Sequence, residues 1–87
     1  MEHELKSWTV FFAALENGSK TFEIRRTDRM FTVGDTLVLR EWEPGSRTYT
    51  GRELRRIVTY IHRPDHQAGD EWQLNHRYCV LGIKDPA

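Results

Sequence analysis

Hydrophobic residues recur with two different periods along the chain, and the change falls near Gly18. Before that glycine they lie three and four positions apart, the spacing of one helix face. These residues are Trp8, Phe11, Phe12 and Leu15. We predict a helix from about Trp8 to Glu16, capped by Ser7 and ended by Asn17-Gly18, with its apolar face in the core.

Beyond the helix the period is two, which predicts strands. In the first strand Phe22 and Ile24 point to one side, while Thr21, Glu23 and Arg25 point to the other. Further strands are expected from Thr36 to Glu43, from Glu53 to His62 and from Tyr78 to Lys84. Turn-forming and polar residues predict loops at 26–30, 43–47, 49–52 and 63–77.

These elements together predict the fold class. A short extended segment at 3–6, one helix and several strands are typical of an α+β, mainly β fold. We expect a small β-barrel with the N-terminal helix packed against it and with Leu37 and Leu39 on its inner face. A chain of 87 residues suffices for one core, so residues 1–87 are expected to form a single domain.

Charge is balanced overall but unevenly distributed. The chain has thirteen basic and thirteen acidic residues, so it is not a polybasic binder. Ten basic residues, against six acids, lie between Lys20 and Arg63. Arginine outnumbers lysine ten to three, and arginine contacts phosphate with two hydrogen bonds and stacks on bases. This pattern indicates either a nucleic-acid-directed surface or a solvated surface of ion pairs.

The number of cysteines and the hydropathy of the chain indicate the cellular compartment to expect. Cys79 is the single cysteine, so no intramolecular disulfide forms, and a reducing, cytoplasmic setting is expected. No apolar run approaches the roughly 20 residues of a membrane span, so no membrane partner is expected. The first residues lack the basic and then apolar form of a signal peptide.

The segment from Gly18 to Arg25 carries the most chemistry. A glycine stop leads directly into a strand with Lys20, Glu23 and Arg25 on or beside its polar face. The two cations suit a phosphate or a carbonyl, and the carboxylate suits a base or an acceptor for a nucleobase amine. The alternative is an ion-pair ladder on an exposed strand.

This segment, in the order Gly-x-Lys-x-x-Glu-x-Arg after a short helix, resembles the signature of the ASCH domains of the PUA-like β-barrel superfamily. Within them the chain is most similar to a small bacterial and phage branch labelled domain of unknown function 3850. The resemblance continues through His3 to Lys6, Asp28-Arg29, Phe31 to Asp35, Leu37 to Glu41, Tyr49 to Arg52, Val58 to Ile61 and Val80 to Ile83.

The resemblance implies a PUA-like barrel with a cleft beside the helix-to-strand turn, and it implies RNA binding. Some ASCH relatives hydrolyse acetylated cytidine, and ribonuclease activity is attributed to another. In the hydrolytic relatives a lysine and a threonine three positions later act with a glutamate from a later insert. Lys20 matches that lysine, Glu23 stands at the threonine position, and no comparably long insert is present here.

We therefore expect an RNA- or nucleotide-binding module with a Lys20, Glu23 and Arg25 cleft. Phosphate contacts are expected from Arg25, Arg29 and Arg52. The candidate aromatic residues for stacking on an unpaired base are Trp42, Tyr49 and Tyr60. Glu23 is expected to hydrogen-bond a base edge.

Two other function classes stay open. One is a small hydrolase, an amidohydrolase on a modified nucleoside or a ribonuclease, with Lys20 and Glu23 as the catalytic pair. The other is a module that binds a protein partner along the barrel edge. No cofactor or metal is expected, because the spacing of His62, His66 and His76 matches no zinc pattern. Cys79 is expected to pack as a small hydrophobic residue.

Overall fold

The computed structural model describes residues 1–64 and 75–86. Its elements, in chain order, are β1 (Glu2–Trp8), α1 (Thr9–Glu16), β2 (Phe22–Arg26), β3 (Thr36–Glu43), β4 (Thr48–His62) and β5 (Tyr78–Lys84). The prediction of a mainly β fold with one N-terminal helix is confirmed. No helix in the described ranges is long and apolar enough to cross a membrane.

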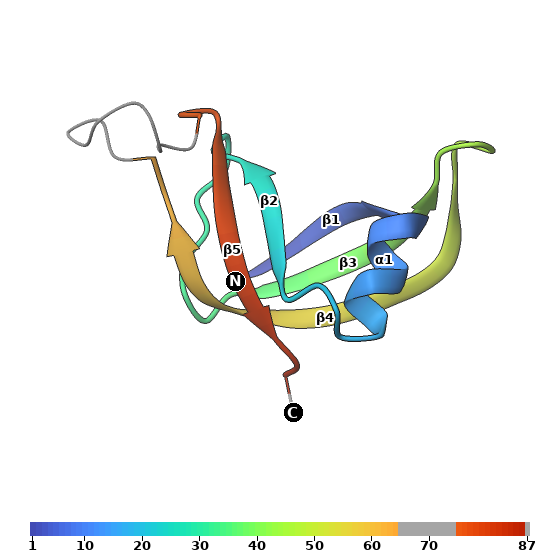
Figure 1. Ribbon diagram of the computed structural model, residues 1–87, viewed down its shortest axis with the longest axis horizontal. Coiled ribbons are helices and arrows are strands. Elements are labelled where there is room, and N and C mark those ends of the chain that lie inside the picture. The colour runs from blue at the N-terminus through green and yellow to red at the C-terminus, as the bar shows by residue number, and fades with distance from the viewer. Residues whose placement is uncertain (65–74, 87) are drawn as a thin grey trace.

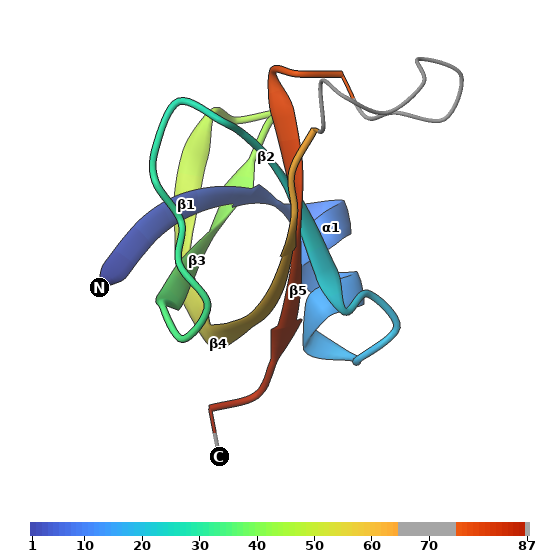
Figure 2. The same ribbon diagram turned by 90° about the vertical axis from the view of Figure 1, so that its left-hand side faces the viewer.

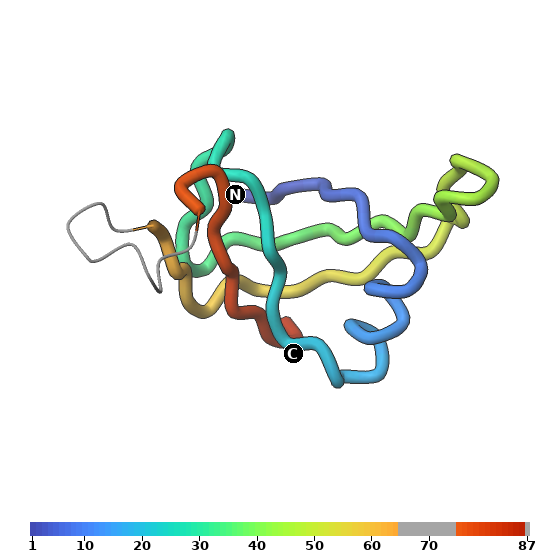
Figure 3. Tube along the Cα trace, turned by 45° about the horizontal axis from the view of Figure 1, so that its top comes forward, coloured from blue at the N-terminus to red at the C-terminus, as the bar shows by residue number. Residues whose placement is uncertain are grey.

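The five strands form one sheet in the order β1-β3-β4-β5-β2. β1 runs parallel to β3, whereas β3, β4, β5 and β2 pair antiparallel in turn. The sheet curls round into a half-barrel (Figures 1 and 2). Figure 3 traces the chain from β1 through α1 and back along β2. The helix therefore links the two edge strands, β1 and β2.

Alternating residues of the curled sheet fill its inner side. The buried hydrophobic cluster includes Leu5, Leu15, Phe31, Leu37, Leu39, Val58, Cys79, Leu81 and Ile83. Leu37 and Leu39 lie inside as predicted, and Cys79 packs there as a small hydrophobic residue. Each fully buried aliphatic side chain contributes about 1.5–3 kcal/mol by leaving water. The hydrophobic core lies inside the curled sheet. The two edge strands, β1 and β2, each keep one unpaired edge outside this core.

The predicted start of the helix is wrong. Ser7 lies within β1 and caps nothing, because the parallel pairing of β1 with β3 extends as far as Trp8 opposite Trp42. The helix begins only after this pairing ends, at Thr9. Phe12 is buried as expected, but Trp8 and Phe11 are each 49% exposed. Half of the predicted apolar helix face is therefore at the surface.

The long strand also differs from its prediction. β4 begins at Thr48, so residues 49–52 form strand and not the expected turn. Gly51, with φ 94°, takes up a left-handed conformation within it, which glycine tolerates without a Cβ penalty. A register shift between Val58 and Tyr60 interrupts the alternation, so Thr59 and Tyr60 are both exposed and Ile61 returns to the core side.

Other predictions hold. β3 and β5 have the predicted bounds, and the turn between Glu43 and Arg47 is present. The polar loop predicted at 63–77 lies largely outside the described residues. Asp35 holds the turn before β3, because one carboxylate oxygen accepts hydrogen bonds from Thr32 N (3.0 Å) and His3 Nε2 (2.8 Å).

Candidate functional site

The two edge strands face each other across an open seam. β1 pairs with β3 and β2 pairs with β5, and no ladder joins β1 to β2 in the described strands. A side chain crosses the seam instead: the Arg25 guanidinium donates from Nη2 to the Lys6 carbonyl oxygen at 2.9 Å. The main-chain groups that pair elsewhere in the sheet are thus available here to a side chain or a ligand.

Glu23 is the centre of the seam. It is 3% exposed, and each of its carboxylate oxygens accepts a charge-assisted hydrogen bond. Lys20 Nζ donates to Oε1 at 3.0 Å, and Arg25 Nε donates to Oε2 at 2.8 Å. A buried carboxylate needs such partners to offset the loss of water. Two cations therefore hold one acceptor in a fixed orientation.

The inner face of β2 explains this burial. The alternation along β2 is as predicted, but the polar side faces inward and the apolar side, with Phe22 and Ile24, is exposed. β2 is an edge strand, so its inner face looks across the seam toward β1 and not into the centre of the core. The three predicted residues Lys20, Glu23 and Arg25 are brought together here. The ion pairs of the alternative interpretation are present, but Glu23 is buried and does not lie on an exposed face.

A cleft of about 470 Å³ opens over this cluster. It is lined by Lys6, Ser7, Trp8, Phe11, Lys20, Phe22, Glu23, Ile24 and Arg25. Its apolar lining is largely aromatic, and Lys20 Nζ lies 4.9 Å from the Phe11 ring centre and 5.5 Å from that of Phe22. The cleft combines flat apolar surfaces with a small group of hydrogen-bonding side chains, which is typical of small-molecule sites.

Ser7 is an unexpected member of the site. Its hydroxyl is buried in the cleft lining and has no hydrogen-bond partner among the described residues. The sequence predicts that Ser7 caps the helix and that Trp8 and Phe11 lie in the core. The available signal was the alternation of His3, Leu5 and Ser7, which places the serine on the inner side of a strand.

Trp42 and Tyr49, predicted to stack on a base, lie beside the cleft in a cluster of their own. Their rings meet edge to face, 5.0 Å between centres. Lys6 Nζ lies 3.9 Å from the Trp42 ring centre, and Arg40 Cζ lies 4.2 Å from that of Tyr49. Cations of the chain itself therefore already contact both rings. Lys6 also lines the cleft, so the two groups adjoin.

Three other predicted residues lie away from the cleft. Arg52 pairs with Glu16 and lies 3.7 Å from Glu41, and the hydrogen bond with Glu16 raises the pKa of its guanidinium. Arg29 lies in the loop after β2 and lines other depressions. Tyr60 is 65% exposed, on the outer side of β4. Their contact with a ligand stays a prediction.

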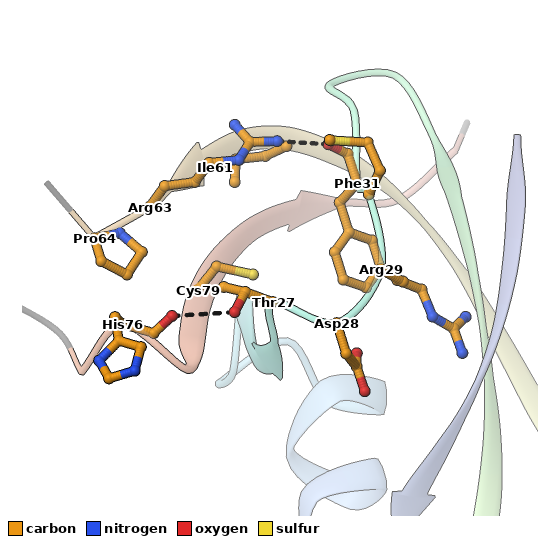
Figure 4. A pocket seen from close by; sticks show the side chains of 10 residues that line it. Thr27, Asp28, Arg29, Phe31, Ile61, Arg63, Pro64, His76 and Cys79 are labelled. Carbon is orange, nitrogen blue, oxygen red and sulfur yellow. Dashed lines mark hydrogen bonds between the residues drawn. The ribbon is translucent and has the colours of Figure 1, made fainter.

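A second cleft, of about 480 Å³, lies at the other end of the curled sheet (Figure 4). Arg63 donates to the Phe31 carbonyl at 2.7 Å, and Thr27 Oγ1 donates to the His76 carbonyl at 3.1 Å. Burial raises the pKa of the Cys79 thiol, which disfavours the nucleophilic thiolate. His66, from the histidine set considered above, lies outside the described residues. Among the described residues no group of three ligating side chains suits a metal.

The chain has relatives. A family model described as "Domain of unknown function (DUF3850)" matches residues 2–83. An "Uncharacterized 12.9 kDa protein in GpA 3'region" of Escherichia phage P2 is 39% identical to the chain over 59 residues. This similarity covers 68% of the chain and 52% of the phage protein, so the chain matches about half the length of that relative.

Proposed function

This chain belongs to the DUF3850 family of domains of unknown function, and we propose that it binds RNA or a nucleotide through the seam cleft. The observation that carries the proposal is a fixed Lys20, Glu23 and Arg25 cluster within an aromatic cleft. We also propose that the family is a branch of the ASCH domains with a PUA-like barrel. The curled sheet and the helix-to-strand position of the cleft support that assignment.

The apolar lining suits a nucleobase. Purines and pyrimidines are flat, and proteins that bind unpaired bases stack them on aromatic side chains. Trp8, Phe11 and Phe22 present such surfaces at one cleft, each between 41% and 49% exposed. Large aromatic side chains left exposed around a concave site indicate a binding role, because burying them in the core would add stability.

The polar groups suit the edge of a base. Glu23 accepts hydrogen bonds, so it matches an exocyclic amine such as that of cytosine. Lys20 and Arg25 donate, and they match a carbonyl oxygen or a phosphate. Ser7 adds a hydroxyl that both donates and accepts and that nothing described in the protein uses. Together these groups provide complementary partners for a heteroaromatic ring with both donors and acceptors.

A hydrolase is the second candidate, and one contact favours it. Lys20 Nζ and a Glu23 carboxylate oxygen lie 3.0 Å apart inside the cleft. In an amidohydrolase such a pair would position a water for attack on the acetyl carbonyl and stabilise the oxyanion that forms. The C–N bond then breaks, the amine takes a proton from the water, and acetate and cytidine are released. Against this role, each Glu23 oxygen already accepts a hydrogen bond from a cation, which suits a fixed acceptor better than a mobile base.

Calorimetric titration with nucleosides, nucleotides and a short single-stranded RNA tests the proposal. Glu23→Gln keeps the shape of the side chain and replaces one acceptor oxygen by a donor, so we expect at least about tenfold weaker binding. Arg55→Gln is the matched control, because Arg55 is exposed on the outer face and pairs with Glu2 at 3.0 Å. We expect that variant to bind like the wild type.

Three outcomes would overturn the proposal. One is the absence of binding to every nucleoside, nucleotide and RNA by wild-type protein shown to be folded by circular dichroism. The second is release of acetate from acetylated cytidine that is lost in Lys20→Ala, which would make the chain a hydrolase. The third is an equal loss of binding in Glu23→Gln and Arg55→Gln, which would show that the cleft is not the binding site.

A further inference from the structure

The outer face of β2, β5 and the end of β4 carries an exposed aromatic surface. The strand register aligns Phe22, Gly82 and Tyr60 in one row across the three strands. The next row consists of Ile24, Val80 and His62. Phe22 is 41% exposed and Tyr60 65%. We call these six residues the outer platform; β2 and β5, two of its three strands, stand at the front of Figure 1.

Gly82 sets the shape of the platform. A Cβ atom at Gly82 would lie 3.1 Å from Thr59 Oγ1 and 3.5 Å from Tyr60 Cβ, so a side chain there would crowd the Thr59 hydroxyl. Neighbouring strands are about 4.8 Å apart, which places Phe22 and Tyr60 on strands about 10 Å apart with only backbone and a hydroxyl between them. A flat ring has access to this surface from solvent.

The outward charges on the strands of the platform are of one sign, and Asp85, directly after β5, pairs with Arg56 at 3.1 Å. The other outward residues of these strands include Arg26 on β2 and Lys84 on β5. Within the described strand segments 22–26, 57–62 and 78–84 the one acidic residue is Glu23. Its side chain points inward to the cleft. A neutral chain thus presents an aromatic surface with a basic border, which attracts a polyanion.

The opposite outer face lacks this character. It carries Glu2 and Glu4 on β1, and Arg55 on β4 is paired with Glu2. Its aromatic rings, Trp42 and Tyr49, are already contacted by Lys6 and Arg40. Electrostatics and the available ring faces therefore both favour the outer platform as the path for a charged, base-containing ligand.

We propose that the outer platform is a second binding surface and that it takes a single strand of nucleic acid. Phe22 joins the two surfaces, because it lines the seam cleft and begins the platform row. One base occupies the cleft, and the neighbouring base of the same strand stacks on Phe22 and Tyr60 beside Lys84. The ligand is then an oligonucleotide and not a free nucleoside. This inference rests on the proposed function.

Fluorescence anisotropy with labelled six-residue single strands of RNA and DNA tests the platform, and calorimetry with single nucleosides tests the cleft. We expect Tyr60→Ala to weaken oligonucleotide binding about tenfold or more, because one stacked base is lost, and to leave nucleoside binding unchanged. Tyr60→Phe keeps the ring and is expected to restore affinity. Val33→Ala, which removes apolar surface at a residue that is 58% exposed in the turn before β3, is the control and is expected to bind normally.

The outcomes separate the two proposals. Weaker binding of nucleoside and oligonucleotide in Glu23→Gln, with weaker oligonucleotide binding and unchanged nucleoside binding in Tyr60→Ala, supports both. Oligonucleotide affinity in Tyr60→Ala that equals that of the wild type and of Val33→Ala overturns the platform and leaves the cleft intact. A dimer of the wild type that Tyr60→Ala converts to a monomer in sedimentation, without loss of oligonucleotide affinity, also overturns it and assigns the face to self-association. The relative affinity for the RNA and the DNA oligonucleotide shows which nucleic acid the protein prefers.

Discussion

At the residue scale, Ser7 separates binding from stability. Its buried hydroxyl has no described partner, and an unsatisfied buried hydroxyl costs free energy. We predict that Ser7→Ala raises the free energy of unfolding by about 1 kcal/mol and weakens nucleoside binding, because only a ligand uses the hydroxyl. Urea denaturation and calorimetric titration measure the two effects. The control is Ser46→Ala, whose hydroxyl lies at the exposed β3–β4 turn 2.7 Å from Thr48 Oγ1. A destabilised Ser7→Ala with unchanged affinity would give Ser7 a structural role.

Single residues also show which part of the site the sequence predicts. Lys20, Glu23 and Arg25 are near neighbours in the chain, so one strand suffices to bring them together. Ser7 joins them only through the curl of the whole sheet, which no local pattern records. Glu23 sits on the predicted polar side, but whether that side faces water or a seam depends on what lies opposite an edge strand.

At the element scale, Asp35 ties β1 to the turn that begins β3. Its hydrogen bond from His3 holds the pKa of the Asp35 carboxyl below its usual value, with further lowering by Thr32 N and partial opposition from burial. A carboxyl whose pKa is lowered on folding stabilises the protein above its ordinary pKa, about 3.9. That stability is lost as pH falls through the lowered value. We predict that Asp35→Asn destabilises the protein more at pH 7 than at pH 2, as urea denaturation at both pH values will show.

The matched control for this pH dependence is Asp28→Asn, because Asp28 is exposed in the loop after β2. A loss of stability that is equal at both pH values in Asp35→Asn would assign the effect to packing and not to charge.

The same elements show what local sequence predicts. β5 alternates cleanly, and the bounds of β3 and β5 match the prediction to the residue, whereas the start of α1 depends on the parallel pairing of β1 with β3, a contact of long range.

At the scale of the whole molecule, the fold is a sheet that curls without closing. Three strands are paired on both sides, whereas β1 and β2 each have one free edge, and Arg25 spans the gap between them. Open edges exchange their amide protons faster than paired ones, because less structure must open. The unpaired edges also leave space for the cleft. Pairing β1 with β2 would therefore stabilise the seam but would close the cleft to a ligand. Curling was predictable from the strand count and turns, but the position of the opening was not.

A variant that lacks the hydrogen bond from Arg25 to the Lys6 carbonyl tests whether the seam is a separate unit of stability. Arg25→Lys keeps a cation near Glu23 but lacks the second, forked donor that reaches the Lys6 carbonyl. We predict faster hydrogen exchange along β1 and β2 and unchanged exchange in β3 and β4, measured by NMR on the uniformly labelled protein. Arg56→Lys, on a central strand, is the control. Saturating nucleotide is expected to slow β1 and β2 exchange again, because a ligand bridging the cleft replaces the lost span. Exchange that rises evenly across all five strands would show that Arg25 acts on global stability and that the seam is no separate unit.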